Sequence, residues 1–367
     1  MHQTPISFMI KPVSAACDLA CDYCFYRDAS LHRETAVHPL MSKAVVDQLI
    51  GKSLSSFQTI TYIFQGGEPT LAGLPFFQYF VDKVEQERRS ESAVHYALQT
   101  NGMHLDQEWV AFLKQHSFLV GVSFDGMPRL HDLHRRDLLG NGSARRVLQS
   151  IALLQQEGVA FNILSVVTED LAHNAKPVYS YLLQRNLLHQ QYIPCINPLH
   201  GGADLLHASS YGLFLKELFD LWYESLLHGV AVHIRFFENL VMMLGGYPPE
   251  SCDMAGRCSP QYVIESNGNV YPCDFYALDE YLLGSVISDD FPTFAQQAQT
   301  NHFLEHTENQ IDSCSTCSWS MLCRGGCKRF RTSDGYRFCP SMRTFFPYAY
   351  GRLQIIAQQK FASQKPS

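Results

Sequence analysis

The chain has 367 residues, a formal net charge of −7 and a pI of about 6.1. This balance provides no basic face for nucleic acid, and residues 1–10 lack the charged start and long apolar core of a signal peptide. No apolar stretch approaches the ~18 residues that a membrane span needs, so we expect a soluble, cytoplasmic protein.

Residues 1–232 alternate short apolar runs with amphipathic stretches. The expected strands are 7–10, 59–64, 93–100, 118–124, 159–168 and 190–196, and the expected helices between them are 42–54, 76–89, 106–116, 143–156 and 175–185. Such units join parallel strands through right-handed crossovers. Six units are too few to close an eight-stranded barrel. We therefore expect an α/β fold, a partial (β/α)6 barrel, with its chemistry at the carboxyl ends of the strands.

The remainder, residues 233–367, is expected to form a second domain. Helices at 210–229 and 236–244 bridge into it, and the chain becomes loop-rich and cysteine-dense after Cys252. Short apolar pieces at 262–265 and 269–271 predict a hairpin, and residues 344–359 predict a final helix. A segment with so few apolar runs is expected to depend on bound metal for its fold.

The chain contains twelve cysteines. In a cytoplasmic protein this number indicates metal ligation rather than disulfides. Cys17, Cys21 and Cys24 form a CxxxCxxC triplet, which can bind three irons of a 4Fe–4S cluster and leave the fourth iron open. An open coordination position is typical of a catalytic site. The alternatives are a partial zinc site or buried free cysteines.

Eight further cysteines follow residue 250, enough for two sets of four ligands. They are Cys252, Cys258, Cys273, Cys314, Cys317, Cys323, Cys327 and Cys339. Thiolates also suit zinc, so two structural zinc sites are the alternative. Cys195 is left over, and we expect it to be a buried cysteine without a ligand role.

Other polar residues lie where the expected strands end. Gly66-Gly67-Glu68-Pro69 follows the second strand, and its glycines would allow a close approach of backbone to a ligand. Ser123 ends the fourth strand, and Arg135 follows it with a fork suited to a carboxylate. Asp274 comes directly after Cys273, so it is either a base beside a cluster or a turn aspartate. The alternative for the glycine turn is an ordinary tight turn, and the alternative for Arg135 is a solvated surface charge.

CxxxCxxC followed by an aromatic residue resembles the radical S-adenosylmethionine (SAM) enzymes. The ordered set I-K-P-V-S-A-A-C-D-L-A-C-D-Y-C-F-Y, F-Q-G-G-E-P-T-L-A-G, L-Q-T-N-G, F-L-V-G-V-S-F-D-G, V-Y-P-C-D-F-Y and C-R-G-G-C is similar to the anaerobic sulfatase-maturating enzymes over about residues 5–355. The resemblance implies a radical SAM core over 1–232 and a SPASM domain with a C-terminal helix over 233–367. It also implies SAM and three 4Fe–4S clusters as cofactors.

The implied reaction is the oxidation of a Cys or Ser in a sulfatase C/S-x-A/P-x-R motif to Cα-formylglycine. A 5′-deoxyadenosyl radical would abstract the Cβ hydrogen of the target residue. The implied partners are an unfolded or nascent sulfatase polypeptide and an electron donor such as flavodoxin or ferredoxin.

The resemblance also assigns site residues. The implied cluster ligands are Cys17, Cys21 and Cys24 for the SAM cluster, Cys252, Cys258, Cys273 and Cys327 for auxiliary cluster I, and Cys314, Cys317, Cys323 and Cys339 for auxiliary cluster II. The implied cofactor contacts are Tyr26, Gly66, Gly67, Glu68, Ser123, Arg135 and Ile196. Tyr26, Gln65 and Gln99 would line the substrate pocket, and Asp274 would be the general base. Because the spacer before it is short, Cys339 is the least secure ligand.

Two other functions remain open. One is a different SPASM enzyme that crosslinks or epimerises peptides, although with the cysteine triplet starting at residue 17 we expect no leader-binding domain before it. The other is a non-catalytic electron carrier, which the open three-cysteine site disfavours.

Overall fold

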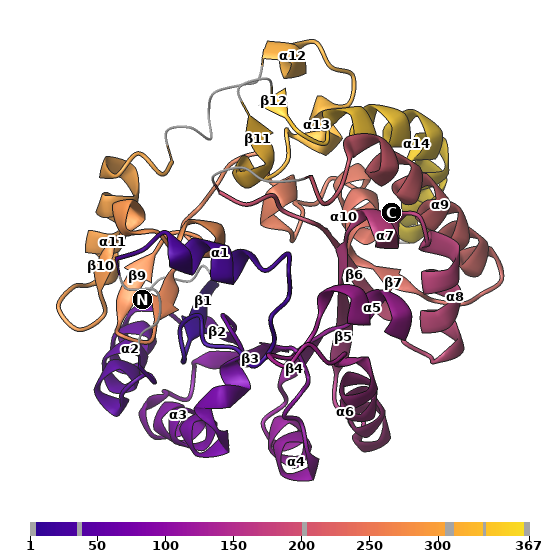
Figure 1. Ribbon diagram of the computed structural model, residues 1–367. Helices are drawn as coiled ribbons and strands as arrows, with labels where there is room; N and C mark the ends of the chain where they lie inside the picture. The colour runs from indigo at the N-terminus through magenta and orange to yellow at the C-terminus, as the bar shows by residue number, and fades with distance from the viewer. Residues whose placement is uncertain (1–4, 35–38, 200–203, 305–311, 333–334, 363–367) are drawn as a thin grey trace. The chain divides into compact units, whose positions relative to one another are not determined.

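The computed structural model describes residues 5–34, 39–199, 204–304, 312–332 and 335–362. The chain forms two compact units, each assembled from several segments (Figure 1). The first unit comprises Met1–Ser123, His131–Phe161 and Pro260–Phe303, and the second comprises Phe124–Leu130, Asn162–Ser259 and Leu304–Ser367. No helix in the described part of the chain is long and apolar enough to cross a membrane.

The first unit is built on a mainly parallel sheet. Its strands are β1 (Ile6–Lys11), β2 (Thr59–Phe64), β3 (Ala93–Thr100), β4 (Leu119–Ser123), β8 (Val263–Glu265), β9 (Asn269–Tyr271) and β10 (Gly284–Ser285). Strands β1 to β4 pair in chain order and in parallel. On its other side β1 pairs in parallel with β8, which continues into the antiparallel strands β9 and β10. The predicted hairpin is therefore confirmed.

Burial alternates along these strands, as expected for a sheet with two different faces. In β2 every second residue is buried, and Tyr62 and Phe64 pack with Phe80 of α3. The helices of this unit are α1 (Phe25–Leu31), α2 (Lys43–Ser56), α3 (Leu74–Glu87), α4 (Gln107–Gln115), α6 (Ala144–Glu157) and α11 (Phe291–Thr300). Figure 1 shows α2, α3 and α4 along the outer side of β1 to β4. The inner side and the strand ends are thus left for the loops that carry polar residues.

The second unit combines three parallel strands with a helical layer. Its strands are β5 (Phe161–Val167), β6 (His189–Pro194) and β7 (His233–Ile234), with the short pair β11 (Arg331–Thr332) and β12 (Gly335–Tyr336). Its helices are α7 (Glu169–Ala172), α8 (Ala175–Gln184), α9 (Ala208–Leu227), α10 (Arg235–Leu244), α12 (Asp312–Ser315), α13 (Ser320–Cys323) and α14 (Cys339–Ala362). The residues of α5 (Pro128–His134) are divided between the two units. Rings of Phe219, Phe237 and Phe345 pack α9, α10 and α14 together.

The predicted α/β class with a large parallel sheet is confirmed. All six expected strands of the N-terminal region are present, and β2 and β3 have the predicted bounds. The final helix begins at Cys339 rather than at residue 344. Pro340 is compatible with this earlier start, because proline fits the first turn of a helix. The boundary expected between 232 and 233 stays a prediction.

Candidate functional site

Three cysteines lie on the loop between β1 and α1, namely Cys17, Cys21 and Cys24. The Gly66–Gly67 turn that ends β2 binds this loop directly. Gly67 N donates to Ser14 O at 3.0 Å, and a Cβ on Gly67 would lie 2.0 Å from Ala16 O. Gly66 has a φ of +122°, and a Cβ there would lie 2.9 Å from Ser14 O. The glycines are therefore needed for the close packing of this turn against the cysteine loop.

The carboxylate of Glu68 ties the same turn to the end of β3. The side chain is fully buried, and Oε1 accepts from Thr70 N at 3.0 Å and Thr100 Oγ1 at 2.8 Å. Oε2 accepts from Asn101 N at 2.7 Å. Burial raises the pKa of Glu68 above its ordinary value, and these hydrogen bonds oppose the rise. These bonds connect the turn to the end of β3.

Asn101 and His134 contact two aspartates of the cysteine loop, Asp18 and Asp22. Asn101 Nδ2 lies 2.7 Å from Asp18 Oδ1 and 3.8 Å from Cys17 Sγ. His134 Nδ1 lies 3.0 Å from a carboxylate oxygen of Asp22. Burial raises the pKa of the Cys17 thiol to about 12, so iron must displace a proton there when it binds. The loop therefore has fixed supports on two sides.

The carboxylate of Asp274 is buried among three polar side chains of the first unit. Tyr26 Oη donates to Asp274 Oδ2 at 2.6 Å, and Gln65 Nε2 donates to the same oxygen at 2.9 Å. Lys11 Nζ lies 3.0 Å from Oδ1. Burial, with the charge of Asp274 next in size, raises the pKa of Tyr26 well above its ordinary value, so Tyr26 is the donor. Asp274 directly follows Cys273, which places this carboxylate beside a predicted cluster ligand.

A row of buried charges continues behind Asp274. Lys11 Nζ lies 3.4 Å from Glu265 Oε1, and Arg33 Nη1 binds the same oxygen at 2.7 Å. The parallel pairing of β1 with β8 places Lys11 opposite Glu265. Burial acts to lower the pKa of Lys11, but Asp274 and Glu265 outweigh it and raise that pKa. Burial acts against ionisation of Glu265, yet Lys11 and Arg33 lower its pKa. Two carboxylates, Asp274 and Glu265, thus alternate with two cations, Lys11 and Arg33, in a charged row whose formal charges cancel.

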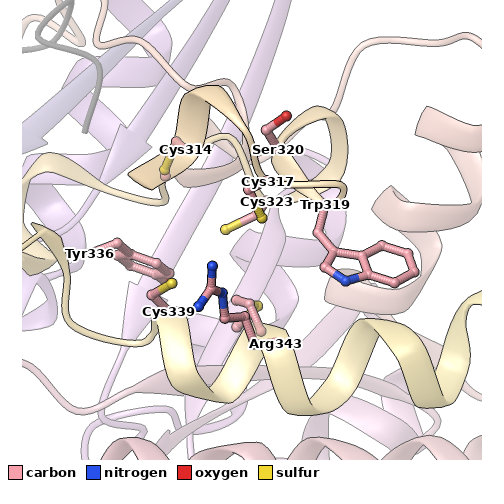
Figure 2. A pocket seen from close by; sticks show the side chains of 10 residues that line it. Cys314, Cys317, Trp319, Ser320, Cys323, Tyr336, Cys339 and Arg343 are labelled. Carbon is pink, nitrogen blue, oxygen red and sulfur yellow. The ribbon is translucent and has the colours of Figure 1, made fainter. Parts of the chain in front are cut away.

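Four cysteines of the second unit line a small cavity that is partly open to solvent (Figure 2). They are Cys314, Cys317, Cys323 and Cys339. Tyr336, Trp319 and Arg343 also line the cavity, and Figure 2 shows the Arg343 guanidinium extending from α14 towards the thiols. Within the described ranges, no three His, Cys, Asp or Glu side chains converge on one metal-ion position. Thiols spread around a cavity fit a polynuclear iron–sulfur cluster.

A second group of thiols lies in the same unit. Cys252 and Cys258 are close enough to Cys327 to raise its pKa, which burial brings to about 12. Cys273 belongs to the first unit, so its place as the fourth ligand stays a prediction. Cys195 is buried on the segment after β6, with 1% of its surface exposed.

The remaining predicted cofactor contacts are Ser123, Arg135 and Ile196. Ser123 ends β4, and Gln99, a predicted substrate-pocket residue, lies near the end of β3. Arg135 is 8% exposed with its guanidinium 5.4 Å from the centre of the Tyr23 ring, so the alternative of a solvated surface charge is wrong. Ile196 is buried in the second unit. Their contacts with SAM stay predictions.

Comparison with known proteins agrees with this geometry. Residues 12–171 match the model of the radical SAM superfamily, and residues 252–318 match that of the SPASM iron–sulfur cluster-binding domain. The chain is 36% identical over 365 residues to the cysteine-type anaerobic sulfatase-maturating enzyme of Clostridium novyi (strain NT), covering 96% of this chain and 97% of that protein.

The chain belongs to the anaerobic sulfatase-maturating enzymes. The serine-type member from Klebsiella pneumoniae is 30% identical over 93% of this chain and 87% of its own length. Among solved structures, native anSMEcpe with bound AdoMet matches with a TM-score of 0.92 and 36% identity, over 96% of this chain and 99% of that one. The same enzyme with AdoMet and the Cp18Cys peptide matches with a TM-score of 0.91.

Two residues important to this member of the family were not predicted from the sequence. Lys11 ends an otherwise apolar strand, and a charged residue at that point could have been a signal. Asn101 lies in the L-Q-T-N-G motif, but only the fold shows that it joins the Glu68 turn to the cysteine loop.

Proposed function

We propose that this chain oxidises a cysteine in a sulfatase C/S-x-A/P-x-R motif to Cα-formylglycine. Identity to the cysteine-type enzyme of Clostridium novyi is 36%, against 30% and 27% for serine-type enzymes of Klebsiella pneumoniae and Bacteroides thetaiotaomicron. This difference favours a cysteine target, with serine as the second substrate to try. The partner would be an unfolded or nascent sulfatase polypeptide.

The proposed cofactors are SAM and three 4Fe–4S clusters. Their ligands would be Cys17, Cys21 and Cys24 beside SAM, Cys252, Cys258, Cys273 and Cys327 in auxiliary cluster I, and Cys314, Cys317, Cys323 and Cys339 in auxiliary cluster II. When bound, SAM and its cluster supply the one-electron chemistry that removes a hydrogen atom from Cβ of the target residue. Around SAM we assign contacts to Tyr26, Gly66, Gly67, Glu68, Ser123, Arg135 and Ile196, and Glu68 also supports the turn.

We assign Asp274 as the general base. After loss of the Cβ hydrogen, the thiol proton moves to the Asp274 carboxylate. One electron must also leave the substrate, and an auxiliary cluster would accept it. Water then replaces sulfur in the resulting thioaldehyde and releases sulfide. Tyr26 and Gln65, with Gln99 further along the pocket, would orient the target residue. Lys11 supplies the counter-charge that allows the Asp274 carboxylate to remain buried.

The observation that carries this proposal is the buried Asp274 carboxylate, which directly follows the proposed cluster ligand Cys273. It has Tyr26 and Gln65 on one oxygen and a lysine on the other. A turn aspartate would instead bind neighbouring backbone amides, and the side-chain partners of Asp274 come from distant parts of the chain. Such an arrangement fits proton transfer at a fixed atom.

The test is anaerobic mass spectrometry of a cysteine-type sulfatase-motif peptide after incubation with reconstituted protein, SAM and dithionite. We expect a peptide mass corresponding to formylglycine, together with 5′-deoxyadenosine. Cleavage of SAM with an unaltered peptide, both in the cysteine and in the serine form, would contradict the proposal and favour a crosslinking or epimerising enzyme.

A further inference from the structure

The turn between α5 and α6, residues 137–141, presents two neighbouring leucines to solvent. Leu138 is 71% exposed and Leu139 is 88% exposed. We call residues 137–141 the di-leucine turn. A single exposed leucine is ordinary on a protein surface, but two at the tip of one turn form a small apolar knob that the core of the first unit does not explain.

Hydrogen bonds within the di-leucine turn connect its two ends. Asp137 Oδ1 accepts from Leu139 N at 2.9 Å and from Asn141 N at 2.8 Å, and Asp137 N donates to Asn141 O at 2.9 Å. Gly140 N also donates to Asp137 O at 3.0 Å. Because these bonds hold the backbone in place, a partner that binds the leucines has little ordering entropy to overcome.

The turn is attached to the loop that carries the first three cysteines. Ala20 N donates to Arg136 O at 2.8 Å, and Leu19 forms an antiparallel bridge with Asp137. His134 binds Asp22 on the same loop. All of these residues belong to the first unit. A protein seated on the di-leucine turn would therefore lie against the loop of Cys17 and Cys21.

The charges around the leucines favour an acidic partner. Arg136 and Arg145 are both exposed, one directly before the turn and one in the first turn of α6. The neighbouring carboxylates have partners of their own: Asp132 Oδ1 accepts from Ala144 N at 2.8 Å, Asp137 caps its own turn, and Asp22, whose side chain is 57% exposed, lies 3.0 Å from His134 Nδ1. The exposed surface thus combines an apolar centre with positive charge at its edge.

We propose that the di-leucine turn is the docking site of a small acidic one-electron carrier protein that reduces the cluster on Cys17, Cys21 and Cys24. This proposal rests on the iron–sulfur cluster of the proposed function. One electron passes from the reduced carrier to the oxidised cluster, and no bond forms or breaks. Electron carriers bind their partners through small interfaces. The two leucines and the arginines beside them are therefore large enough to form such an interface.

The test compares two reductants on the reconstituted holoenzyme with SAM. The rate of 5′-deoxyadenosine formation is measured against the concentration of reduced flavodoxin, and separately with dithionite, for wild type and the double variant Leu138→Ser, Leu139→Ser. We expect the variant to raise the KM for flavodoxin roughly tenfold or more, since it removes the apolar area that the proposed interface would bury, and to leave the dithionite rate unchanged. Direct titration should show a similar loss of flavodoxin affinity.

Two controls sharpen the result. The double variant Leu213→Ser, Leu227→Ser removes leucines of α9 that are 62% and 69% exposed, and it should leave the flavodoxin KM unchanged. The double variant Arg136→Gln, Arg145→Gln should weaken flavodoxin binding and flatten its dependence on salt.

The proposal is overturned if the leucine variant binds flavodoxin like wild type, or if the rates with both reductants fall equally. It is also overturned if the variant instead raises the KM for the sulfatase peptide with dithionite, which would make the turn a substrate site, or changes only the sedimentation of the protein, which would make it a contact between copies. The assay needs no sulfatase, so wild type that cleaves SAM but leaves the peptide unaltered refutes the proposed function and leaves this test valid.

Discussion

Replacing Lys11 by Met removes the cation between two buried carboxylates while keeping a side chain of similar length. Lys11 is 4% exposed and contacts both Asp274 and Glu265. Removal of one partner from a buried ion pair costs ~3–5 kcal/mol. Glu265 retains Arg33, and Asp274 retains Tyr26 and Gln65. The lower end of that range, about 3 kcal/mol of unfolding free energy, is therefore expected.

The assay is urea unfolding of the reconstituted protein under anaerobic conditions, with SAM cleavage and formylglycine formation measured on the same samples. Because Asp274 loses the anchor of its Oδ1 atom, we also expect fewer formylglycine products per 5′-deoxyadenosine formed. Lys52→Met is the matched control: Lys52 binds backbone oxygens of Val286 and Asp289 in the same unit, so the product ratio should not change. An unfolding midpoint and a product ratio for Lys11→Met equal to those of wild type would refute the reasoning.

Three further predictions follow from the same geometry. Gly67→Ala places a Cβ 2.0 Å from Ala16 O, so the cysteine loop must shift; iron analysis should show loss of the SAM cluster, whereas full iron content would contradict the packing argument. Cys339→Ser should lower iron content by one cluster and remove its spectroscopic signal while the signal of the SAM cluster remains, and an unchanged spectrum would exclude Cys339 as a ligand. The pKa of Glu265 is lowered from its ordinary value of 4.5 in the folded protein. Ionisation of Glu265 therefore stabilises the fold above pH 4.5, and this stabilisation is lost as the pH falls through the folded-state pKa. The unfolding midpoint of wild type should consequently fall more steeply below pH 4.5 than that of Glu265→Gln, and parallel pH curves would disprove the charged row.

Local patterns were sufficient to predict the six N-terminal strands, the hairpin of β8 and β9 and the cysteine groups, but not the two-residue strands β7, β10, β11 and β12. Alternating burial along β2 follows directly from its sequence, and the spacing of the cysteine triplet predicts a cluster site without knowledge of the fold. Cys339 was the least secure ligand because of its short spacer from Cys327. The early start of α14 brings it to the same cavity as Cys314, Cys317 and Cys323.

The support of Asp274 could not be predicted in this way. Lys11 meets Glu265 only because β8 pairs with β1, and these residues lie far apart in the chain. Neither the residue types nor their local spacing predicts that β1 pairs with β8. The Glu68 carboxylate illustrates the same limit: the G-G-E-P motif predicts a ligand turn, whereas its buried bonds to Thr100 and Asn101 depend on the neighbouring strand β3.

The central claim is that Asp274 takes the proton from the target residue after hydrogen abstraction. The most direct test is the ratio of formylglycine to 5′-deoxyadenosine for wild type and Asp274→Asn, both reconstituted and given SAM, dithionite and the cysteine-type peptide. The account predicts that the variant still cleaves SAM but forms little formylglycine, because asparagine keeps the shape and cannot accept the proton. Equal ratios in the two proteins would contradict it.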